Sequence, residues 1–145
     1  MAETKEAAGD LRPAPSPDGE SAPYWAAAKS HRFELQHCAA CAAWIFPPRA
    51  LCPTCWTEPV WKSPSGRGTV YTFTIMRDSF MKGFPPPYVV AQVELEDQPG
   101  LRMLTNIIGC NVDDVRIGMP VEVTFEQTGE AWVPLFRPAR QSSEL

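Results

Sequence analysis

The chain has 145 residues, of which 44% are hydrophobic and 21% are charged, with a formal net charge of −4. A chain of this length and composition forms one globular domain, or one domain with a small module attached. Proteins that bind duplex nucleic acid neutralise its phosphates with clustered lysines and arginines. With 13 basic residues, no basic run and an excess of acidic groups, this chain is not suited to that function.

The first residues lack the apolar core of a secretory signal peptide. No apolar stretch of about 18 residues, the length that spans a membrane, occurs in the sequence. We therefore expect a cytoplasmic protein without a membrane partner. Thiols stay reduced in that compartment, and an odd count of 5 cysteines also argues against a framework of disulfides.

Residues 1–22 are predicted to form a disordered tail. They are rich in proline, alanine, serine and glutamate, with Leu11 as an isolated large apolar residue. Such a segment buries too little apolar surface to offset the conformational entropy lost on ordering. Residues 139–145 are expected to be a flexible C-terminus.

A short helix is predicted over residues 23–34, where Pro23 precedes a run of good helix formers. Tyr24, Trp25 and Ala28 would make one apolar side. Isolated helices of this length are marginal, so this one needs a surface to pack on. The apolar side is either part of the core or a contact for a partner, and the sequence leaves both open.

Residues 35–62 carry two C-x-x-C motifs, whose cysteines are Cys38, Cys41, Cys52 and Cys55. Thiolates are strong zinc ligands, and two such pairs supply the four sulfurs of a tetrahedral site. The gap between the pairs is shorter than usual but suffices for a hairpin, as in a zinc ribbon. A redox dithiol is the weaker alternative, because it requires a βαβ context that is absent here. Four thiolates leave no open ligand position, so we expect structural zinc that stabilises this small module.

Four large aromatic residues surround these cysteines: Trp44, Phe46, Trp56 and Trp61. The simpler interpretation is a miniature core over the ribbon, which has little else to bury. The alternative is an exposed aromatic patch for a partner.

Residues 63–138 are predicted to form a five-stranded sheet. The strands are expected over 69–76, 88–96, 101–108, 121–126 and 131–136, where β-branched and aromatic residues alternate with polar ones. A helical turn is expected within 111–118, after the third strand. This order indicates a closed barrel of the OB type, with a sandwich as the alternative. The fold is therefore predicted to be mainly β.

The long connection between the first two strands, residues 77–88, combines cations with apolar groups. Arg77 and Lys82 could bind an anionic group, while Phe84 and Tyr88 could contact an apolar one. Long loops of small barrels often carry function, although this one could be an ordinary proline-stiffened loop.

Cys110 is the remaining cysteine, and a nucleophilic cysteine needs a base and an orienting group. The two histidines, His31 and His37, both precede or lie within the ribbon. We therefore expect Cys110 to be a small, buried or half-buried apolar residue. His37 is either a hydrogen-bond donor near the zinc or a plain loop residue.

Several short motifs resemble the DUF35 family. They are LQHCAAC (35–41), FPPR (46–49), LCPTC (51–55), GRGTVY (66–71), PYVVA (87–91) and IGMPV (117–121). The resemblance covers about residues 23 to 138. It implies an N-terminal helix, a rubredoxin-like zinc ribbon and a C-terminal OB-fold barrel.

The resemblance also implies a function. Family members are acyl-CoA-associated proteins that work beside a thiolase-like catalytic subunit, in thiolases or in retro-aldolases. This chain would then be a non-catalytic subunit of a hetero-oligomer that stabilises its partner and shares a coenzyme A thioester with it. Arg77, Lys82, Phe84 and Tyr88 would lie near the acyl-CoA or the partner, and Tyr24 and Trp25 would contact the partner.

Three other functions remain open. One is a subunit that accompanies a MaoC-type enoyl-CoA hydratase, as some family members do. Another is a module that binds single-stranded nucleic acid, since OB barrels and zinc ribbons can do so through stacking aromatics. A stand-alone enzyme that uses Cys110 is the third.

Overall fold

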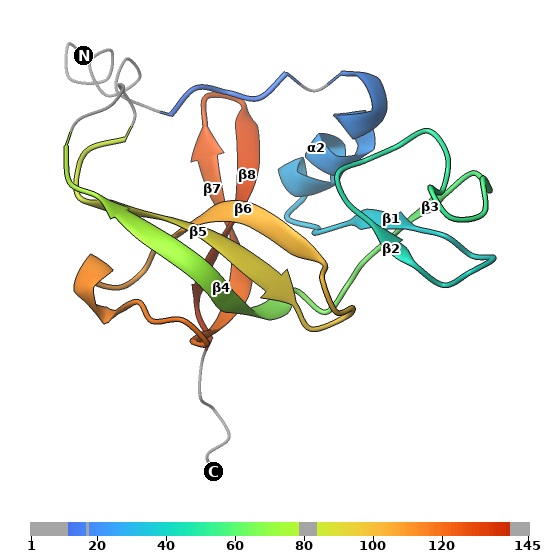
Figure 1. Ribbon diagram of the computed structural model, residues 1–145. Helices are drawn as coiled ribbons and strands as arrows, with labels where there is room; N and C mark the ends of the chain where they lie inside the picture. The colour runs from blue at the N-terminus through green and yellow to red at the C-terminus, as the bar shows by residue number, and fades with distance from the viewer. Residues whose placement is uncertain (1–11, 17, 79–83, 140–145) are drawn as a thin grey trace.

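The computed structural model describes residues 12–16, 18–78 and 84–139. One short α-helix precedes a three-stranded sheet, and a closed five-stranded barrel follows (Figure 1). The predicted mainly-β fold of helix, zinc ribbon and OB-type barrel is confirmed, and the sandwich is excluded. Across these residues, no helix has the length and apolar character needed to cross a membrane.

The helical segment begins with the 3-10 helix η1 (Gly19–Ser21) and continues as α2 (Ala22–Lys29). It is shorter than the predicted 23–34. His31 has a positive φ of 59°, which reverses the chain just after the helix. Tyr24, Ala27 and Ala28 form the buried side of α2, which packs against the last strand of the barrel.

The zinc ribbon contains β1 (Leu35–His37), β2 (Trp44–Ile45) and β3 (Val60–Lys62), in the order β2-β1-β3 with antiparallel pairing. The buried Gln36 side chain accepts a hydrogen bond from the backbone N–H of Arg49 at 2.7 Å. The same side chain donates to the Arg49 carbonyl at 2.8 Å. These two bonds hold the loop that joins the two cysteine pairs against β1.

The barrel strands are β4 (Arg67–Met76), β5 (Tyr88–Leu95), β6 (Arg102–Ile107), β7 (Pro120–Thr128) and β8 (Ala131–Pro138). Their order is β4-β5-β6-β8-β7, and β4 pairs with β7 to close the barrel. The β6–β8 junction is parallel and rests on the pair Ile107 and Phe136. The predicted helical turn is the 3-10 helix η2 (Val112–Asp114).

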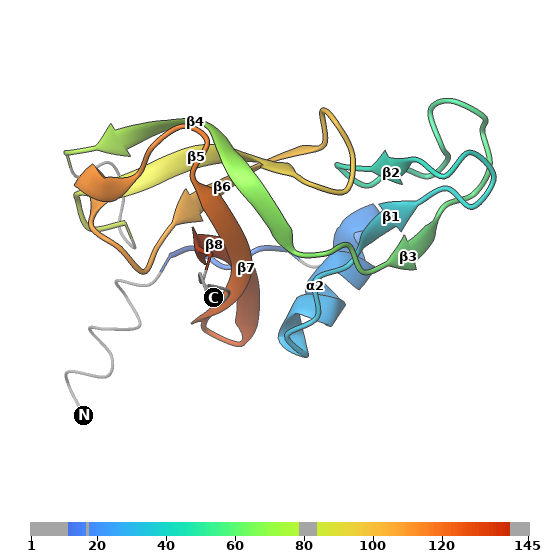
Figure 2. The same cartoon turned by 90° about the horizontal axis from the view of Figure 1, so that it is seen from below.

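The core is shared by the barrel, the helix and the first ribbon strand. Alternate residues of β5, such as Val89 and Val93, point inward, as a strand with one buried face requires. Tyr24 and Leu35 belong to the same buried cluster. In both views α2 lies between the ribbon and the barrel (Figures 1 and 2), so the helix fills the junction of the two parts.

The predicted disordered tail is only partly described, because residues 1–11 and 17 lie outside the described residues. Within residues 12–16, the Arg12 side chain contacts two barrel strands. Residues 19–22 are helical. Ala139 bonds to the Pro120 carbonyl at 3.0 Å, and the rest of the predicted flexible C-terminus lies outside the described residues.

Candidate functional site

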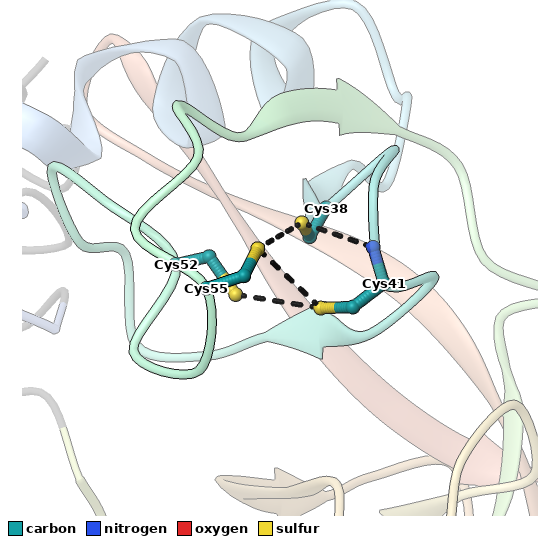
Figure 3. A group of neighbouring side chains, drawn as sticks. All are labelled: Cys38, Cys41, Cys52 and Cys55. Carbon is teal, nitrogen blue, oxygen red and sulfur yellow. Dashed lines mark hydrogen bonds between the residues drawn. The ribbon is translucent and has the colours of Figure 1, made fainter.

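The four predicted cysteines converge at one point of the ribbon (Figure 3). Their sulfur atoms all lie within 4.8 Å of one another. The S–S separations include 3.4 Å for Cys38–Cys55, 3.6 Å for Cys41–Cys52 and 3.9 Å for Cys41–Cys55. A tetrahedral zinc ion with Zn–S bonds of about 2.3 Å places its sulfurs about 3.8 Å apart. The donor set and its spacing therefore fit zinc.

Both C-x-x-C segments fold into the same turn. In the first, the Cys38 N–H donates to the Ala43 carbonyl and the Ala42 N–H donates to the Cys38 carbonyl. In the second, Cys52 makes the equivalent bonds with Thr57 and Trp56. We call these turns the first knuckle (38–43) and the second knuckle (52–57). Each knuckle aims its two sulfurs at a common centre.

The metal centre has a buried side and an exposed side. Cys38 and Cys52 are fully buried with Ile45, whereas Cys41 and Cys55 are exposed. A hydrogen bond between the Thr57 hydroxyl and Cys55 Sγ, with a second bond from the Thr57 backbone, lowers the pKa of Cys55 to about 6. Hydrogen bonds with Cys38 and Cys52 raise the pKa of Cys41 to about 12. Zinc binding would displace the protons that remain on the thiols.

A zinc ion held by these four thiolates would have no open position for water or substrate. Sites of this type stabilise folds and do not activate ligands. The residues present therefore fit a zinc ion with a structural role.

The aromatic residues of the ribbon divide into two groups. Trp44, Phe46 and Trp61 are partly buried and pack against the main core, as the miniature-core interpretation predicts in part. Trp56 instead is 72% exposed. His37 lies in β1, where its ring packs edge-on against Trp44 at 4.7 Å, so it is not a loop residue.

A groove of about 410 Å³ runs between α2, the ribbon loop and the barrel. Trp25, Phe46, Tyr88 and Leu104 line its apolar surface. Phe84 lies 5.3 Å from Tyr88 between ring centroids, so the two aromatic residues predicted from the long connection are neighbours in this groove.

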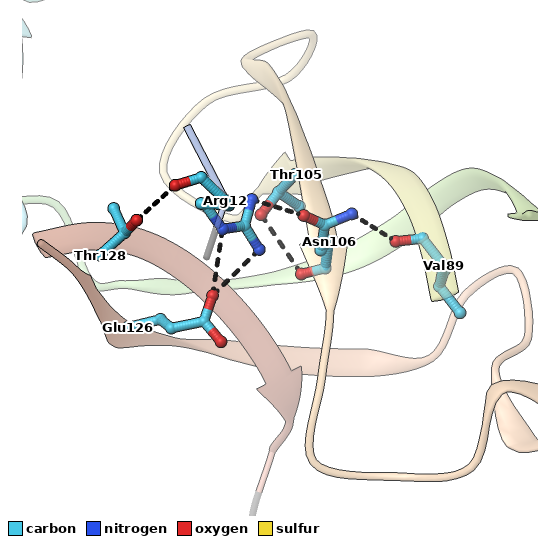
Figure 4. A network of polar contacts seen from close by, with 6 residues as sticks. All are labelled: Arg12, Val89, Thr105, Asn106, Glu126 and Thr128. Atoms are coloured by element: carbon cyan, nitrogen blue, oxygen red, sulfur yellow. Dashed lines mark hydrogen bonds and ion pairs between the residues drawn. The ribbon is translucent and has the colours of Figure 1, made fainter. Parts of the chain in front are cut away.

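Arg12 supplies the positive charge of this groove and was not predicted from the sequence. Its Nη1 donates to Asn106 Oδ1 at 2.9 Å, and its Nε and Nη2 reach Glu126 Oε1 at 3.1 and 3.0 Å (Figure 4). Thr128 donates its hydroxyl proton to the Arg12 carbonyl. The guanidinium also lies 4.8 Å from the centroid of the Phe84 ring. No local pattern marks this arginine, because its polar partners are about a hundred positions away.

The other predicted groove residues have different positions. Arg77 pairs with Asp113 at 3.1 Å and lines a separate pocket of about 400 Å³ with Cys110. Lys82 lies outside the described residues. Tyr24 is only 7% exposed, and burial raises the pKa of its hydroxyl. Tyr24 is therefore a core residue, whereas Trp25 is partly buried and packs against the core.

Cys110 has the character predicted for it. It is half-buried and packs against the core. Burial and the neighbouring Asp114 carboxylate raise the pKa of its thiol, which disfavours the thiolate that a nucleophile requires. The histidine rings lie against aromatic residues, with His31 stacked on Phe125 at 5.2 Å.

Family models match the chain in two consecutive parts. Residues 25–60 match the rubredoxin-like zinc ribbon domain of ChsH2, and residues 61–126 match the C-terminal OB-fold domain of ChsH2. These parts correspond to the metal centre and to most of the barrel described above.

Curated relatives include proteins of two kinds. The chain is 37% identical over 145 residues to a probable enoyl-CoA hydratase alpha subunit of Thermomonospora curvata, covering 98% of this chain and 44% of that protein. This chain thus spans less than half the length of that relative. It is also 37% identical over 97 residues to a DUF35 domain-containing scaffold protein of Methanocaldococcus jannaschii, covering 64% of this chain and 67% of that protein.

A solved structure described as the Ltp2-ChsH2(DUF35) aldolase contains a similar chain. The two are 37% identical with a TM-score of 0.79, and the match covers 89% of this chain and 100% of that chain. The zinc ribbon and the OB-fold thus occur together in this chain, and the match to the chain of that structure covers most of it. This chain belongs to the DUF35 family, with the zinc ribbon and OB-fold domains of ChsH2.

Proposed function

We propose that this chain is the non-catalytic, zinc-containing subunit of a hetero-oligomeric acyl-CoA enzyme with a thiolase-like catalytic partner. The observation that carries the proposal is the match to the whole DUF35 chain of a two-component aldolase. The reaction would be cleavage of a carbon–carbon bond in a β-keto or β-hydroxy acyl-CoA, by thiolysis or by a retro-aldol step. The groups that act on the substrate would belong to the partner.

The metal centre supports a structural contribution to that assembly. Four thiolates around zinc stabilise a ribbon that has little apolar core of its own. A rigid ribbon and a closed barrel, joined through α2, would present fixed surfaces to the catalytic subunit. This is what a scaffold requires of its fold.

The groove between α2 and the barrel is the proposed place for acyl-CoA or for the partner beside it. Coenzyme A is a polyanion with an apolar arm, and the groove combines aromatic rings with one guanidinium. Phe84 and Tyr88 would contact the arm, and an anionic group would compete with Glu126 for the Arg12 guanidinium. Arg77 and Lys82, on the same long connection, would add positive charge near the acyl-CoA or the partner.

Co-expression with the Ltp2 polypeptide tests the proposed function. We expect the two chains to elute together on size exclusion and to cleave an acyl-CoA thioester that this chain alone leaves intact. Cleavage by this chain alone, or separate elution of the two, would refute the proposal.

Affinity measurements on the complex test the groove. Phe84→Ala and Tyr88→Ala should each weaken acyl-CoA binding on the order of tenfold, because each removes buried aromatic contact. Ile117→Ala is the matched control, since Ile117 is a large exposed apolar residue that does not line this groove. If both groove variants kept the wild-type affinity, the proposal that acyl-CoA binds in this groove would be wrong.

A hydratase partner is the second candidate. The similar protein from Thermomonospora curvata is named a hydratase alpha subunit, and this chain matches less than half of it. The corresponding assay is hydration of an enoyl-CoA by a complex of this chain with a MaoC-type hydratase subunit. Hydration with that subunit and no cleavage with Ltp2 would favour the second candidate.

A further inference from the structure

The two knuckles impose the same backbone conformation on one residue each. Ala42 and Trp56 directly follow the second cysteine of their knuckles, and their φ angles are 61° and 65°. Their N–H groups donate to the carbonyls of Cys38 and Cys52, respectively. This left-handed conformation is open to glycine but is disfavoured for residues with a Cβ, and most of all for bulky ones. Alanine keeps that penalty small, whereas tryptophan does not.

Among the described residues, burial of the Trp56 side chain does not offset this strain. It is 72% exposed, and it is absent from the residues that pack on either buried cluster described here. The hydrogen bonds of the second knuckle are backbone bonds that glycine would make equally well. A strained backbone that holds an exposed aromatic ring points to a role outside the isolated fold.

The segment that carries Trp56, residues 51–60, has two other exposed apolar residues and one negative charge. Leu51 is 42% exposed and Val60 is 49% exposed, so three of the six large exposed apolar residues of the described chain fall within 51–60. Glu58 is the single charged residue of that segment and is exposed. Figures 1 and 2 both show the ribbon projecting beside the barrel, so a partner could approach it.

We propose that Trp56 is an anchor that inserts into an apolar pocket on the catalytic subunit, with a basic residue at the pocket rim opposite Glu58. This inference rests on the proposed function and adds a contact surface to it. Tryptophan is one of the residue types enriched among the strong contacts of protein interfaces. The zinc ion and the knuckle hydrogen bonds hold its backbone in place, which lowers the entropy lost on binding.

Other occupants fit the surface less well. An exposed tryptophan with two half-exposed aliphatic side chains offers on the order of 300 Å² of surface, against about 800 Å² per partner in a stable interface. Two copies joined through this patch alone would bury too little, whereas a larger partner can extend the contact beyond it. Anionic lipid and nucleic acid are disfavoured by the acidic segment and by the net charge of −4.

Trp56→Gly tests the anchor, and Ala42→Gly is its matched control in the other knuckle. Both substitutions relieve a left-handed residue, so both should raise the thermal midpoint of the isolated zinc-loaded chain, Trp56→Gly by more than Ala42→Gly. Only Trp56→Gly should weaken binding to the Ltp2 polypeptide, by about 30-fold, the effect typical of an interface hot spot. Trp56→Phe should recover part of that affinity.

The outcomes separate the anchor from the proposed function. If the wild-type chain binds Ltp2 and Trp56→Gly binds equally well, the anchor is wrong and the proposed function stands. A lower midpoint and lost zinc in Trp56→Gly would show a structural role for Trp56 and would also overturn the anchor. If the wild-type chain does not bind Ltp2, the proposed function fails first. Trp56-dependent dimers, or binding to vesicles of anionic phospholipid, would assign the patch to those occupants instead.

Discussion

The barrel buries alternate residues of its strands, whereas the ribbon's own buried cluster, within the described residues, is Cys38, Ile45 and Cys52. Two of those three are the metal ligands proposed here. The barrel is therefore stabilised mainly by apolar burial, which accumulates along each strand. The ribbon would depend on the zinc ion that its four cysteines fit and on a few hydrogen bonds. One polypeptide thus combines a barrel stabilised by apolar burial with a ribbon that is expected to be stabilised by a metal ion.

Two glutamine side chains add hydrogen bonds to a ribbon that buries few apolar residues. Gln98, from the barrel loop between β5 and β6, accepts from the Trp44 N–H at 2.8 Å and donates to the Trp44 carbonyl at 3.1 Å. Gln36 forms the same two-bond arrangement with Arg49. Each glutamine therefore pairs with a backbone segment as a neighbouring strand would, and Gln98 does so across the two parts.

Of the changes considered, removal of zinc should alter the difference in stability between the ribbon and the barrel most. Structural zinc supplies on the order of 10 kcal/mol to small cysteine modules, so a chelator or Cys38→Ser should unfold the ribbon. The barrel should keep its own structure. Amide NMR spectra would show lost dispersion for residues 35–62 and retained dispersion for β4 to β8. Collapse of both sets of signals would show that the barrel also depends on the metal.

A paired truncation separates the two sources of stability. Leu95→Ala removes buried apolar volume from the barrel and should lower its free energy of unfolding by about 2–5 kcal/mol, measured by urea denaturation. Ile45→Ala, in the ribbon cluster, should leave the barrel transition in place and speed zinc release to a chelator. If both variants shifted the barrel unfolding transition equally, the barrel and the ribbon would not have separate sources of stability.

Gln98→Ala should weaken the connection between the parts. It leaves a backbone N–H and a carbonyl of Trp44 without partners, which costs about 1–3 kcal/mol. Hydrogen exchange at the Trp44 amide should become faster. Gln98→Glu is the control, because a carboxylate can still accept from the Trp44 N–H, so its exchange should change less. Equal exchange in both variants would mean that the bond does not protect this amide.

The contact between Arg12 and Glu126 should have the smallest effect. Glu126 is 44% exposed, so solvent screens this pair and limits its coupling to about 1 kcal/mol. A double-mutant cycle with Arg12→Gln and Glu126→Gln measures that coupling. A coupling of zero would mean that Arg12 is held by its contacts with Asn106, Phe84 and Thr128 and not by Glu126.

Much of the fold could be predicted because its signals are local. The alternation of Val89, Ala91 and Val93 predicted β5, and the spacing of the cysteines predicted the convergence of their sulfurs. Features that depend on distant residues were missed. Arg12 reads as part of a polar tail, since Asn106 and Glu126 are 94 and 114 positions away.

The aromatic residues show another limit of sequence reasoning. Trp44 and Trp56 follow their knuckle cysteines at different positions, yet composition treats them alike. The strand β2 turns Trp44 toward the core, while the left-handed turn at residue 56 holds Trp56 outward. Trp56 directly follows Cys55, as Ala42 directly follows Cys41. This shared position was a signal in the sequence that the two residues have the same backbone conformation.

The contacts of Arg12 determine when the N-terminal segment of a newly synthesised chain can fold onto the barrel. Its partners lie on β6 and β7, and they come together only when the barrel has formed. The ribosome releases the N-terminal segment first, so residues 12–16 must wait until residue 128 has emerged before they can dock. Protection of this segment from a protease during synthesis would thus mark the completed domain.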